Sequence, residues 1–399
     1  MIPQWSDLPD PFLPEHLTDP YPYYRGLRET ARVHITRTGN LGFSRYADCS
    51  AILRDRGWGR NGNENVPPGK RVGEIRSFAR LNPPDHTRLR GLVAMAFTPA
   101  RTASLRPRIE AIVERLLDDA GKLGEVDIMA AVAHPLPITV ICELLGVPPQ
   151  DGPIFAQWCA DINRGLDRSW ALSAEQAKAQ ATARTVALRK LRGYLAELLE
   201  QRRADPADDL ISQLIEVSED SDKLTAEEVV ITCRMLLIAG FEATVNLIGN
   251  GTLALLRNPD QRELVTKEQL PSGTGWIDEL LRFDGPIQLL PVRALEPMEY
   301  AGQWFEQGDM VDLLIGSANH DPEVFTDAGE LDLTRTNATQ LGFGLGIHYC
   351  LGAALARLEG QLVLTALFQR WPGMRLAGEV VRRPQVHPRG LDLLPVRLA

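Results

Sequence analysis

One stretch of this sequence predicts a helix long enough to cross an entire folded domain. Thr225-Ala-Glu-Glu228 has the pattern of a capping box, in which two side chains bond each other's backbone amides at a helix start. The apolar pattern then continues without proline to Asn258-Pro259, about 30 residues or roughly 45 Å of helix. Polar and charged residues interrupt it at Arg234, Glu242, Asn246 and Asn250. A bilayer span needs about 20 predominantly apolar residues, so we expect a buried central helix instead.

The rest of the chain predicts more helices and a small β region. Apolar residues at helical spacing, bounded by proline or glycine, predict helices within 107–117, 138–146, 177–203 and 351–370. Alternating stretches predict a hairpin within 31–46 and strands within 292–315. Residues 59–84 are expected to form an irregular loop, and loops of that length often act as lids. Because no repeat or linker divides residues 1–399, we expect one mainly α domain with a small β part.

Composition and charge exclude several classes of protein. The formal net charge of -9 and the absence of a uniform basic block argue against a nucleic-acid partner. The N-terminus has neither a basic segment nor an apolar segment of a secretory signal, so we expect a cytoplasmic protein without a membrane partner. The five cysteines have no C-x-x-C spacing and are odd in number, so we expect neither disulfides nor a structural zinc site.

The sequence Phe343-Gly-Leu-Gly-Ile-His-Tyr-Cys-Leu-Gly352 places a cysteine among glycines. Glycines remove side chains where the backbone must approach a bulky flat group. The helix expected after Cys350 would favour a thiolate at its positive end. Two functions use a thiolate, namely a nucleophile with His348 as its base and a ligand of a metal centre such as haem iron. We favour the metal ligand, because no third residue orients His348.

These ten residues resemble the haem-binding signature of the cytochrome P-450 superfamily, F-x-x-G-x-x-x-C-x-G, in its soluble bacterial form. Other family motifs have similar counterparts in the family's order: His86-Thr-Arg-Leu-Arg90, Ala239-Gly-Phe-Glu242 and Glu279-Leu-Leu-Arg282. The resemblance implies the cytochrome P-450 fold, with the long central helix over haem b. It also implies that Cys350 is the axial ligand of the iron.

The resemblance assigns further residues to the haem and to the fold. The haem propionates would be bound by His86, Arg90, Arg293 and His348, and the haem would also meet Ala239, Gly240, Phe343, Gly344 and Gly352. Glu279 and Arg282 would form a buried structural lock, although by spacing alone they are an ordinary surface ion pair. The family's third partner of this lock is lost in Ala328-Gly-Glu-Leu331, and Arg335 is a candidate substitute. Asn82 stands where the family usually has aspartate.

The active centre is expected on the central helix. A carboxylate such as Glu242 is costly in an apolar helix unless it is paired or wetted. By resemblance Glu242 delivers protons toward the oxygen site, and its neighbour in most relatives is a threonine. Here that neighbour is Ala243, and Thr244 is one helical step of about 100° further, so we expect Thr244 to point away from the position that Ala243 faces. Ordered water or a hydroxyl of the substrate would then replace the missing hydroxyl.

The function implied is a haem-thiolate monooxygenase that uses O₂ to hydroxylate or epoxidise a small organic molecule. The Ala-Gly-Phe-Glu-Ala pattern is similar to that of relatives acting on macrolides and other polyketide-like compounds. Electrons would come from a ferredoxin and its reductase, docked near Arg88, Arg106 and Arg357. Pocket residues are expected in 59–84, in 161–170, and at Ile238, Ala239, Leu289, Leu290 and Val292. A peroxide-driven peroxygenase and a non-catalytic haem sensor remain alternatives.

Overall fold

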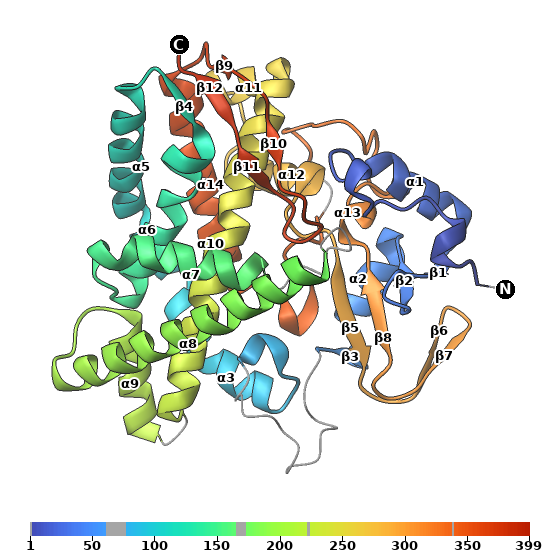
Figure 1. The fold of residues 1–399 in the computed structure, drawn as a ribbon, viewed down its shortest axis with the longest axis horizontal. Coiled ribbons are helices and arrows are strands. Elements are labelled where there is room, and N and C mark those ends of the chain that lie inside the picture. The colour runs from blue at the N-terminus through green and yellow to red at the C-terminus, as the bar shows by residue number, and fades with distance from the viewer. Residues whose placement is uncertain (1, 61–76, 165–172, 222–223, 337–338) are drawn as a thin grey trace.

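The computed structural model describes residues 2–60, 77–164, 173–221, 224–336 and 339–399. Most of the predicted loop 59–84 and the second half of the predicted pocket segment 161–170 therefore lie outside the described residues. Helices gather on one side of the molecule and most strands on the other, and helix α10 runs through the helical part (Figure 1). The described part of the chain is thus mainly α with a small β region, as the sequence predicts.

The α-helices are numbered in chain order. Their bounds are α1 Tyr21–Thr30, α2 Tyr46–Arg54, α3 Asp85–Ala94, α4 Pro99–Ser104, α5 Arg106–Gly121, α6 Pro135–Leu145, α7 Gly152–Arg164, α8 Ala174–Ala204, α9 Leu210–Ser221, α10 Ala226–Arg257, α11 Pro259–Thr266, α12 Gly275–Asp284, α13 Ile315–Ala318 and α14 Ala353–Arg370. A π-helical turn, Met129–Ala133, precedes α6. Gly146 ends α6 in the left-handed conformation, which glycine adopts without steric cost.

Four small sheets make up the β part. The largest has the order β1-β2-β8-β5-β3, with bounds Val33–Ile35, Leu41–Phe43, Met310–Leu313, Leu290–Ala294 and Trp58–Gly59. All its pairings are antiparallel except β2 with β8, where Gly42 lies opposite Asp312. The others join β4 (Glu125–Asp127), β12 (Pro395–Arg397) and β9 (Arg375–Leu376), then β10 (Val381–Arg382) and β11 (Leu391–Leu393), then β6 (Met298–Tyr300) and β7 (Gln303–Phe305). The hairpin predicted within 31–46 is the β1–β2 pair.

Helix α10 is the centre of the fold. The predicted capping box is present, because Thr225 Oγ1 accepts from the Glu228 amide at 3.1 Å and Glu228 Oε2 accepts from the Thr225 amide at 2.8 Å. Helices α6, α7, α8, α12 and α14 all pack against α10. Close packing uses glycine: a Cβ on Gly249 would lie 2.6 Å from the sulfur of Met129. A helix covered on several sides must be apolar on several faces, which explains the continuous apolar pattern.

The C-terminal segment is anchored to the N-terminal segment through one buried carboxylate. Asp284, at the end of α12, accepts from Arg382 at 2.6 Å, from Arg389 at 2.6 Å and from Tyr21 at 2.7 Å. Burial alone would raise the pKa of Asp284, but the two guanidinium groups outweigh it and hold this pKa well below its usual range. Arg389 also donates to the carbonyl of Leu17. The loop between Arg382 and Arg389 is therefore fixed at both ends.

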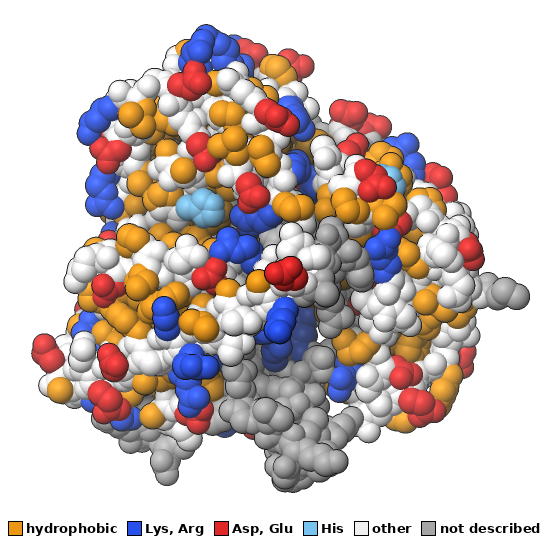
Figure 2. All heavy atoms as spheres, viewed as in Figure 1, with side chains coloured by type: hydrophobic (Ala, Val, Ile, Leu, Met, Phe, Trp, Pro, Cys, Tyr) orange, Lys and Arg blue, Asp and Glu red, His pale blue; other side chains and the backbone are white. Residues whose placement is uncertain are grey.

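The described surface mixes charges of both signs with scattered apolar side chains, as one face of the molecule shows (Figure 2). Among the described residues, no helix is long and apolar enough to cross a membrane. The most exposed large apolar side chains, such as Leu123 and Trp304, lie on separate elements. Isolated exposed apolar residues of this kind are normal on protein surfaces.

Candidate active site

A cavity of about 390 Å³ lies beside the middle of α10. Its walls come from segments far apart in the sequence: α10, the start of α14, the link between α12 and β5, the Cys350 loop and the C-terminal loop. The lining includes predicted site residues from the central helix and from the cysteine loop: Ile238, Ala239, Gly240, Glu242, Ala243, Thr244, Phe343, His348, Cys350 and Gly352, together with Arg90. The structure thus brings most of the predicted site to one cavity.

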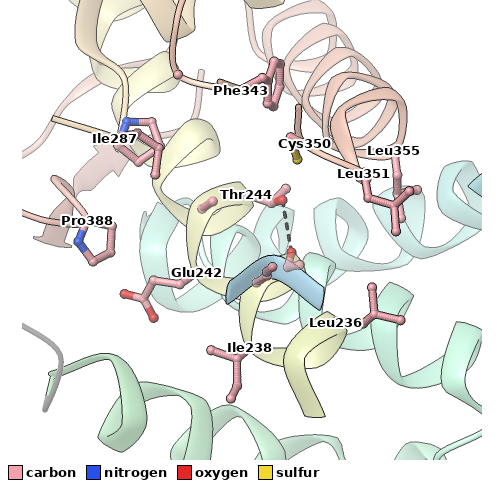
Figure 3. A pocket seen from close by; sticks show the side chains of 18 of the residues that line it. Leu236, Ile238, Glu242, Thr244, Ile287, Phe343, Cys350, Leu351, Leu355 and Pro388 are labelled. Carbon is pink, nitrogen blue, oxygen red and sulfur yellow. Dashed lines mark hydrogen bonds between the residues drawn. The ribbon is translucent and has the colours of Figure 1, made fainter. Parts of the chain in front are cut away.

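The cysteine loop is shaped by its glycines. Gly344 and Gly346 have positive φ angles of 69° and 66°, a region that other residues rarely adopt. A Cβ on Gly346 would also lie 2.6 Å from the Leu53 carbonyl oxygen. The loop is closed by a hydrogen bond of 2.8 Å from the Cys350 amide to the Phe343 carbonyl, and α14 begins at Ala353. Cys350 is thereby presented to the cavity directly before a helix start (Figure 3).

The protonation of Cys350 differs from the sequence-based expectation. Burial raises the pKa of the Cys350 thiol, and the Gly352 amide, Arg90 and Arg357 offset this only in part. The helix start therefore does not by itself give a thiolate, because desolvation of the charged sulfur is the larger effect. A bound cationic metal would supply the missing stabilisation, since a coordinating thiol loses its proton. His348 lies against His86, with ring centroids 4.4 Å apart, and no hydrogen bond joins it to Cys350 among the described contacts.

Cationic and imidazole groups that have no carboxylate partner among the described residues lie in or next to the wall of this cavity. Arg60, Arg90 and His348 line it, and His86 packs on His348. Both ring nitrogens of His86 and Nε2 of His348 are buried without a hydrogen-bond partner. Arg293, on β5, likewise has a buried Nε without a partner, although it does not line the cavity. Buried polar atoms are normally paired, so this cluster has the chemistry expected for binding an anionic group.

The pKa values in the cluster point the same way. Burial lowers the pKa of Arg60 to about 10. Burial also lowers the pKa of His348 to about 3, with Arg60, His86 and Arg90 adding to the effect. Arg60 thus stays a cation whose charge is penalised by burial, whereas His348 is a neutral imidazole that can donate a hydrogen bond. A group with carboxylates, such as haem with its propionates, would offset the penalty on Arg60 and could accept a hydrogen bond from His348.

Arg60 belongs to the segment 59–84 that the sequence analysis expected to line the pocket, although no motif singles it out within that segment. Strand β3 pairs with β5 and brings Arg60 to the cavity, and Asn82 then fixes its backbone. Asn82 Oδ1 accepts from the Arg60 amide at 2.8 Å, while Asn82 Nδ2 donates to the Arg60 carbonyl at 3.1 Å. A carboxylate could not donate the second bond. The amide at this position therefore suits the local backbone.

The Glu242 carboxylate points away from Cys350, and its polar partners lie on that side of α10 (Figure 3). Its carboxylate accepts from Asn163 Nδ2 at 3.1 Å and from the Arg383 guanidinium. Arg383 also donates to Asp392 at 2.9 Å. The side chain of Glu242 is only 7% exposed, so these partners are what make its burial tolerable. The sequence did not indicate Asn163 or Arg383 as partners.

The two residues after Glu242 both line the cavity. That Thr244 points away from the position faced by Ala243 stays a prediction, because two residues can line one cavity from different directions. The Thr244 hydroxyl donates to the Gly240 carbonyl at 3.1 Å, one helical turn earlier (Figure 3). Its proton is therefore engaged within the helix, while its lone pairs remain able to accept.

The Glu279 and Arg282 pair is buried on α12. Their side chains are 2% and 1% exposed and form two hydrogen bonds of 2.7 and 2.8 Å. Arg282 also donates to the carbonyls of Asn319, Ala328 and Glu330. Arg335 Nε lies 3.2 Å from Glu279 Oε2, the position proposed for the substitute partner. A buried pair with this many hydrogen bonds is a structural lock and not a surface ion pair.

Part of the predicted pocket is elsewhere in the structure. Val292 belongs to the core under the largest sheet, and Leu290 packs against that core. Leu289 packs against the N-terminal cluster around Trp5 and Tyr24. The cavity is lined instead by residues just before this strand and by residues of the C-terminal loop: Gly285, Pro286, Ile287, His387 and Pro388. Alternation along a strand does not reveal which face meets a cavity, and this is why the choice of residues was wrong.

The long helix over an apolar cavity, with a cysteine loop opposite and an anion-binding cluster at its side, defines a haem-thiolate protein. The family model for cytochrome P450 matches residues 27–372. The chain therefore belongs to the cytochrome P450 family.

Relatives of known name are similar over nearly the whole chain. The vitamin D(3) 25-hydroxylase of Pseudonocardia autotrophica is 39% identical over 392 residues, which cover 95% of this chain and 94% of the relative. The 6-deoxyerythronolide B hydroxylase of Saccharopolyspora erythraea is also 39% identical, over 95% of this chain and 96% of the relative. The solved structure of the polyketide synthase cytochrome P450 PksS of Bacillus subtilis 168 has a TM-score of 0.87 at 36% identity, covering 98% and 99% of the two chains.

The enzyme is thus a haem-dependent monooxygenase with the cytochrome P450 fold. Haem bound by a thiolate supplies the means to activate O₂ for insertion of one oxygen atom into a substrate. The structure provides a cavity lined largely by apolar side chains, with Cys350 at its wall and Arg60 and Arg90 among its polar lining residues.

Proposed function

We propose that the chain hydroxylates or epoxidises an oxygen-rich natural product, with Cys350 as the axial ligand of haem b. The observation that carries the assignment of Cys350 is its position at the wall of a cavity that Arg60, Arg90 and His348 also line. His86, Arg90, Arg293 and His348, joined by Arg60, are the proposed propionate ligands. Ala239, Gly240, Phe343, Gly344 and Gly352 are proposed to lie next to the macrocycle.

The axial ligand is tested by the ferrous–carbon monoxide difference spectrum of wild type beside Cys350→Ser. A thiolate ligand shifts the Soret band strongly to the red, and this band should be lost in the variant. A wild-type spectrum like that of a histidine ligand would refute the assignment of Cys350. Arg90→Lys, which retains a charge outside the ligand position, is the matched control and should keep the red-shifted band.

The substrate class is inferred from the cavity and from the relatives. Apolar side chains such as Leu236, Ile238 and Ile287 dominate the lining, with polar groups at Asn163 and His387. One relative is named for 6-deoxyerythronolide B, a macrolactone, and the PksS structure belongs to polyketide biosynthesis. A panel of macrolactones and of deoxygenated analogues, scored by the optical shift on binding, tests this. Equal binding of the oxygenated and deoxygenated members would contradict it.

Proton delivery at Ala243 is proposed to use water or a hydroxyl of the substrate. Ala243 has no hydroxyl, and the proton of Thr244 is donated to Gly240. Ala243→Thr should therefore raise the coupling of reductant to product most for substrates that lack hydroxyl groups. Ala243→Gly adds no hydroxyl and serves as the control. Equal coupling in all three proteins would contradict this route.

Electrons are proposed to come from a ferredoxin and its reductase. The arginines expected to form a docking patch are all paired within the chain: Arg88 with Glu228, Arg106 with Glu110 and Arg357 with Asp278. Pairing reduces the free positive charge at these positions, so we expect charge reversal of Arg106 to slow reduction less than twofold at physiological salt. Product formation with hydrogen peroxide alone, at the rate seen with the ferredoxin system, would favour a peroxygenase instead.

A further inference from the structure

His34, on β1, carries a buried imidazole that takes no part in the cavity wall. Its exposed fraction is 0%, and neither ring nitrogen has a hydrogen-bond partner among the described residues. The acid Glu359 on α14, at 2% exposed, is likewise buried with an unpaired Oε2. Burying an unpaired charge is far more costly than burying an unpaired polar atom. The proton on His34 therefore bears on whether the ring can stay covered.

The neighbours of His34 across the largest sheet are a glycine and a carboxylate. His34 lies opposite Gly42 on β2, and Gly42 lies opposite Asp312 on β8. Residues opposite each other on neighbouring strands direct their side chains to the same face of a sheet, so the imidazole and the carboxylate share one face. A Cβ on Gly42 would lie 2.6 Å from Nε2 of His34. The ring thus lies over the glycine, in space that a larger residue would fill.

The Asp312 carboxylate is satisfied without His34. It accepts from Thr36 Oγ1 at 2.7 Å, from Thr38 Oγ1 at 2.6 Å and from Asn40 Nδ2 at 3.3 Å, all in the turn between β1 and β2. Asp312 favours a proton on His34, but desolvation of the ring is the larger effect and lowers the pKa of His34 to about 4. The covered imidazole is therefore neutral at neutral pH.

The other elements around His34 bring no free charge to it. Strands β1 and β2 have no further titratable side chain, and β8 has Asp312 alone. In residues 2–12, Asp7 is exposed, while Asp10 is paired with Arg37 of the turn at 2.5 Å. Asp312 is the single charge that acts on the pKa of His34. A proton taken up by the covered ring would therefore lack a free counter-charge.

Residues 2–12 lie against His34. The rings of Trp5 and His34 have centroids 5.9 Å apart, and Trp5 is itself 8% exposed. The Pro3 carbonyl accepts from the amide of Ile35, the residue after His34, at 3.0 Å. The ends of a chain open at a lower free energy than the sheets they pack against. Opening of this segment is therefore the least costly way to give the ring access to water.

We propose that His34 is a pH-dependent switch: when its imidazole takes up a proton from solvent, residues 2–12 open from the sheet, and when it loses the proton they close again. In the open state the ring meets water, where a histidine holds its proton up to about pH 6.5. Between about pH 6.5 and about pH 4 the open state binds more protons than the closed state, so the open fraction rises as the pH falls. The inference goes beyond the monooxygenase function and does not depend on haem.

Hydrogen exchange of the Ile35 amide tests the switch, because this amide is bonded to Pro3 in the closed state. Exchange of the peptides that contain Ile35 is followed by mass spectrometry on the haem-loaded enzyme at about pH 6.5 and about pH 4.5, and corrected for the intrinsic effect of pH. Protection should fall roughly 40-fold from the higher to the lower pH. The amides of α10 should stay protected, which separates opening of the segment from unfolding of the whole chain.

Three variants assign the effect to one ring. His34→Gln and His34→Leu cannot take up the proton, so the protection of Ile35 should be the same at both pH values in either variant that keeps the circular dichroism of wild type. The control His16→Gln, which replaces a half-buried histidine bonded to the Asp10 carbonyl, should keep the 40-fold change of wild type, roughly. Constant protection of Ile35 in wild type, a fall that persists without His34, or simultaneous loss of protection in α10 would overturn the proposal.

Discussion

The buried acid Glu359 should make the protein less stable as the pH rises. The folded state holds the proton up to the pKa of about 8, whereas the unfolded chain releases it near 4.5. Between these values the folded state binds more protons than the unfolded state, so the free energy of unfolding falls with pH. The slope is about 1.4 kcal/mol per pH unit, and from pH 4.5 to pH 7 the loss is about 3 kcal/mol. Glu359→Gln removes the titration but keeps the shape of the side chain.

Guanidinium unfolding of both proteins across this pH range measures the effect. The stability of Glu359→Gln relative to wild type should be about 3 kcal/mol more favourable at pH 7 than at pH 4, and it should level off above pH 8. The control Glu263→Gln lies on the surface and should show no comparable trend. Parallel pH profiles for wild type and Glu359→Gln would refute the raised pKa, because the folded and unfolded states would then bind this proton equally.

Two other substitutions test the structure and the haem cluster. Arg282→Ala leaves the buried carboxylate of Glu279 with Arg335 and the Asp332 amide and should cost about 3 to 5 kcal/mol of unfolding free energy, whereas Arg370→Ala, which removes exposed ion pairs, should cost under about 1 kcal/mol. Arg60→Gln removes a proposed counter-charge for a propionate and should speed haem transfer to an apo-globin acceptor several-fold.

Each of these expectations has an outcome that would contradict it. Equal unfolding free energies for Arg282→Ala and Arg370→Ala would show that the buried lock contributes no more than a surface pair. A rate of haem transfer from Arg60→Gln equal to that of wild type would remove Arg60 from the proposed propionate ligands.

The sequence predicts the elements whose signals are local. The central helix, its capping box and the β1–β2 hairpin follow from side chains close in sequence, and the structure contains all three. The family motifs also predict that the residues around Cys350 and Glu242 belong to one site, and the structure places them around one cavity. Motifs of this kind succeed because the site is built from short segments, each with its own backbone requirement.

The residues that the sequence did not reveal depend on contacts between distant segments. Arg383 reaches Glu242 across 141 positions, and Asn163 reaches it from α7. Leu289 and Leu290 were predicted to line the pocket, but they pack against two other hydrophobic cores. Glu359 also carries a local signal, since it is a carboxyl-bearing residue between Leu358 and the apolar stretch Leu362-Val-Leu364 of the helix predicted within 351–370, as Glu242 is in the central helix.

The Asp284 carboxylate binds both ends of the C-terminal loop, so the ends and the middle of this loop have different roles. Arg382 and Arg389 hold the loop to α12, whereas His387 and Pro388 meet the cavity between these anchors. A replacement at His387 or Pro388 changes the cavity wall and leaves the anchors in place. Substitutions at these two positions can therefore change which substrates fit the cavity, while the anchored ends of the loop keep the fold unchanged.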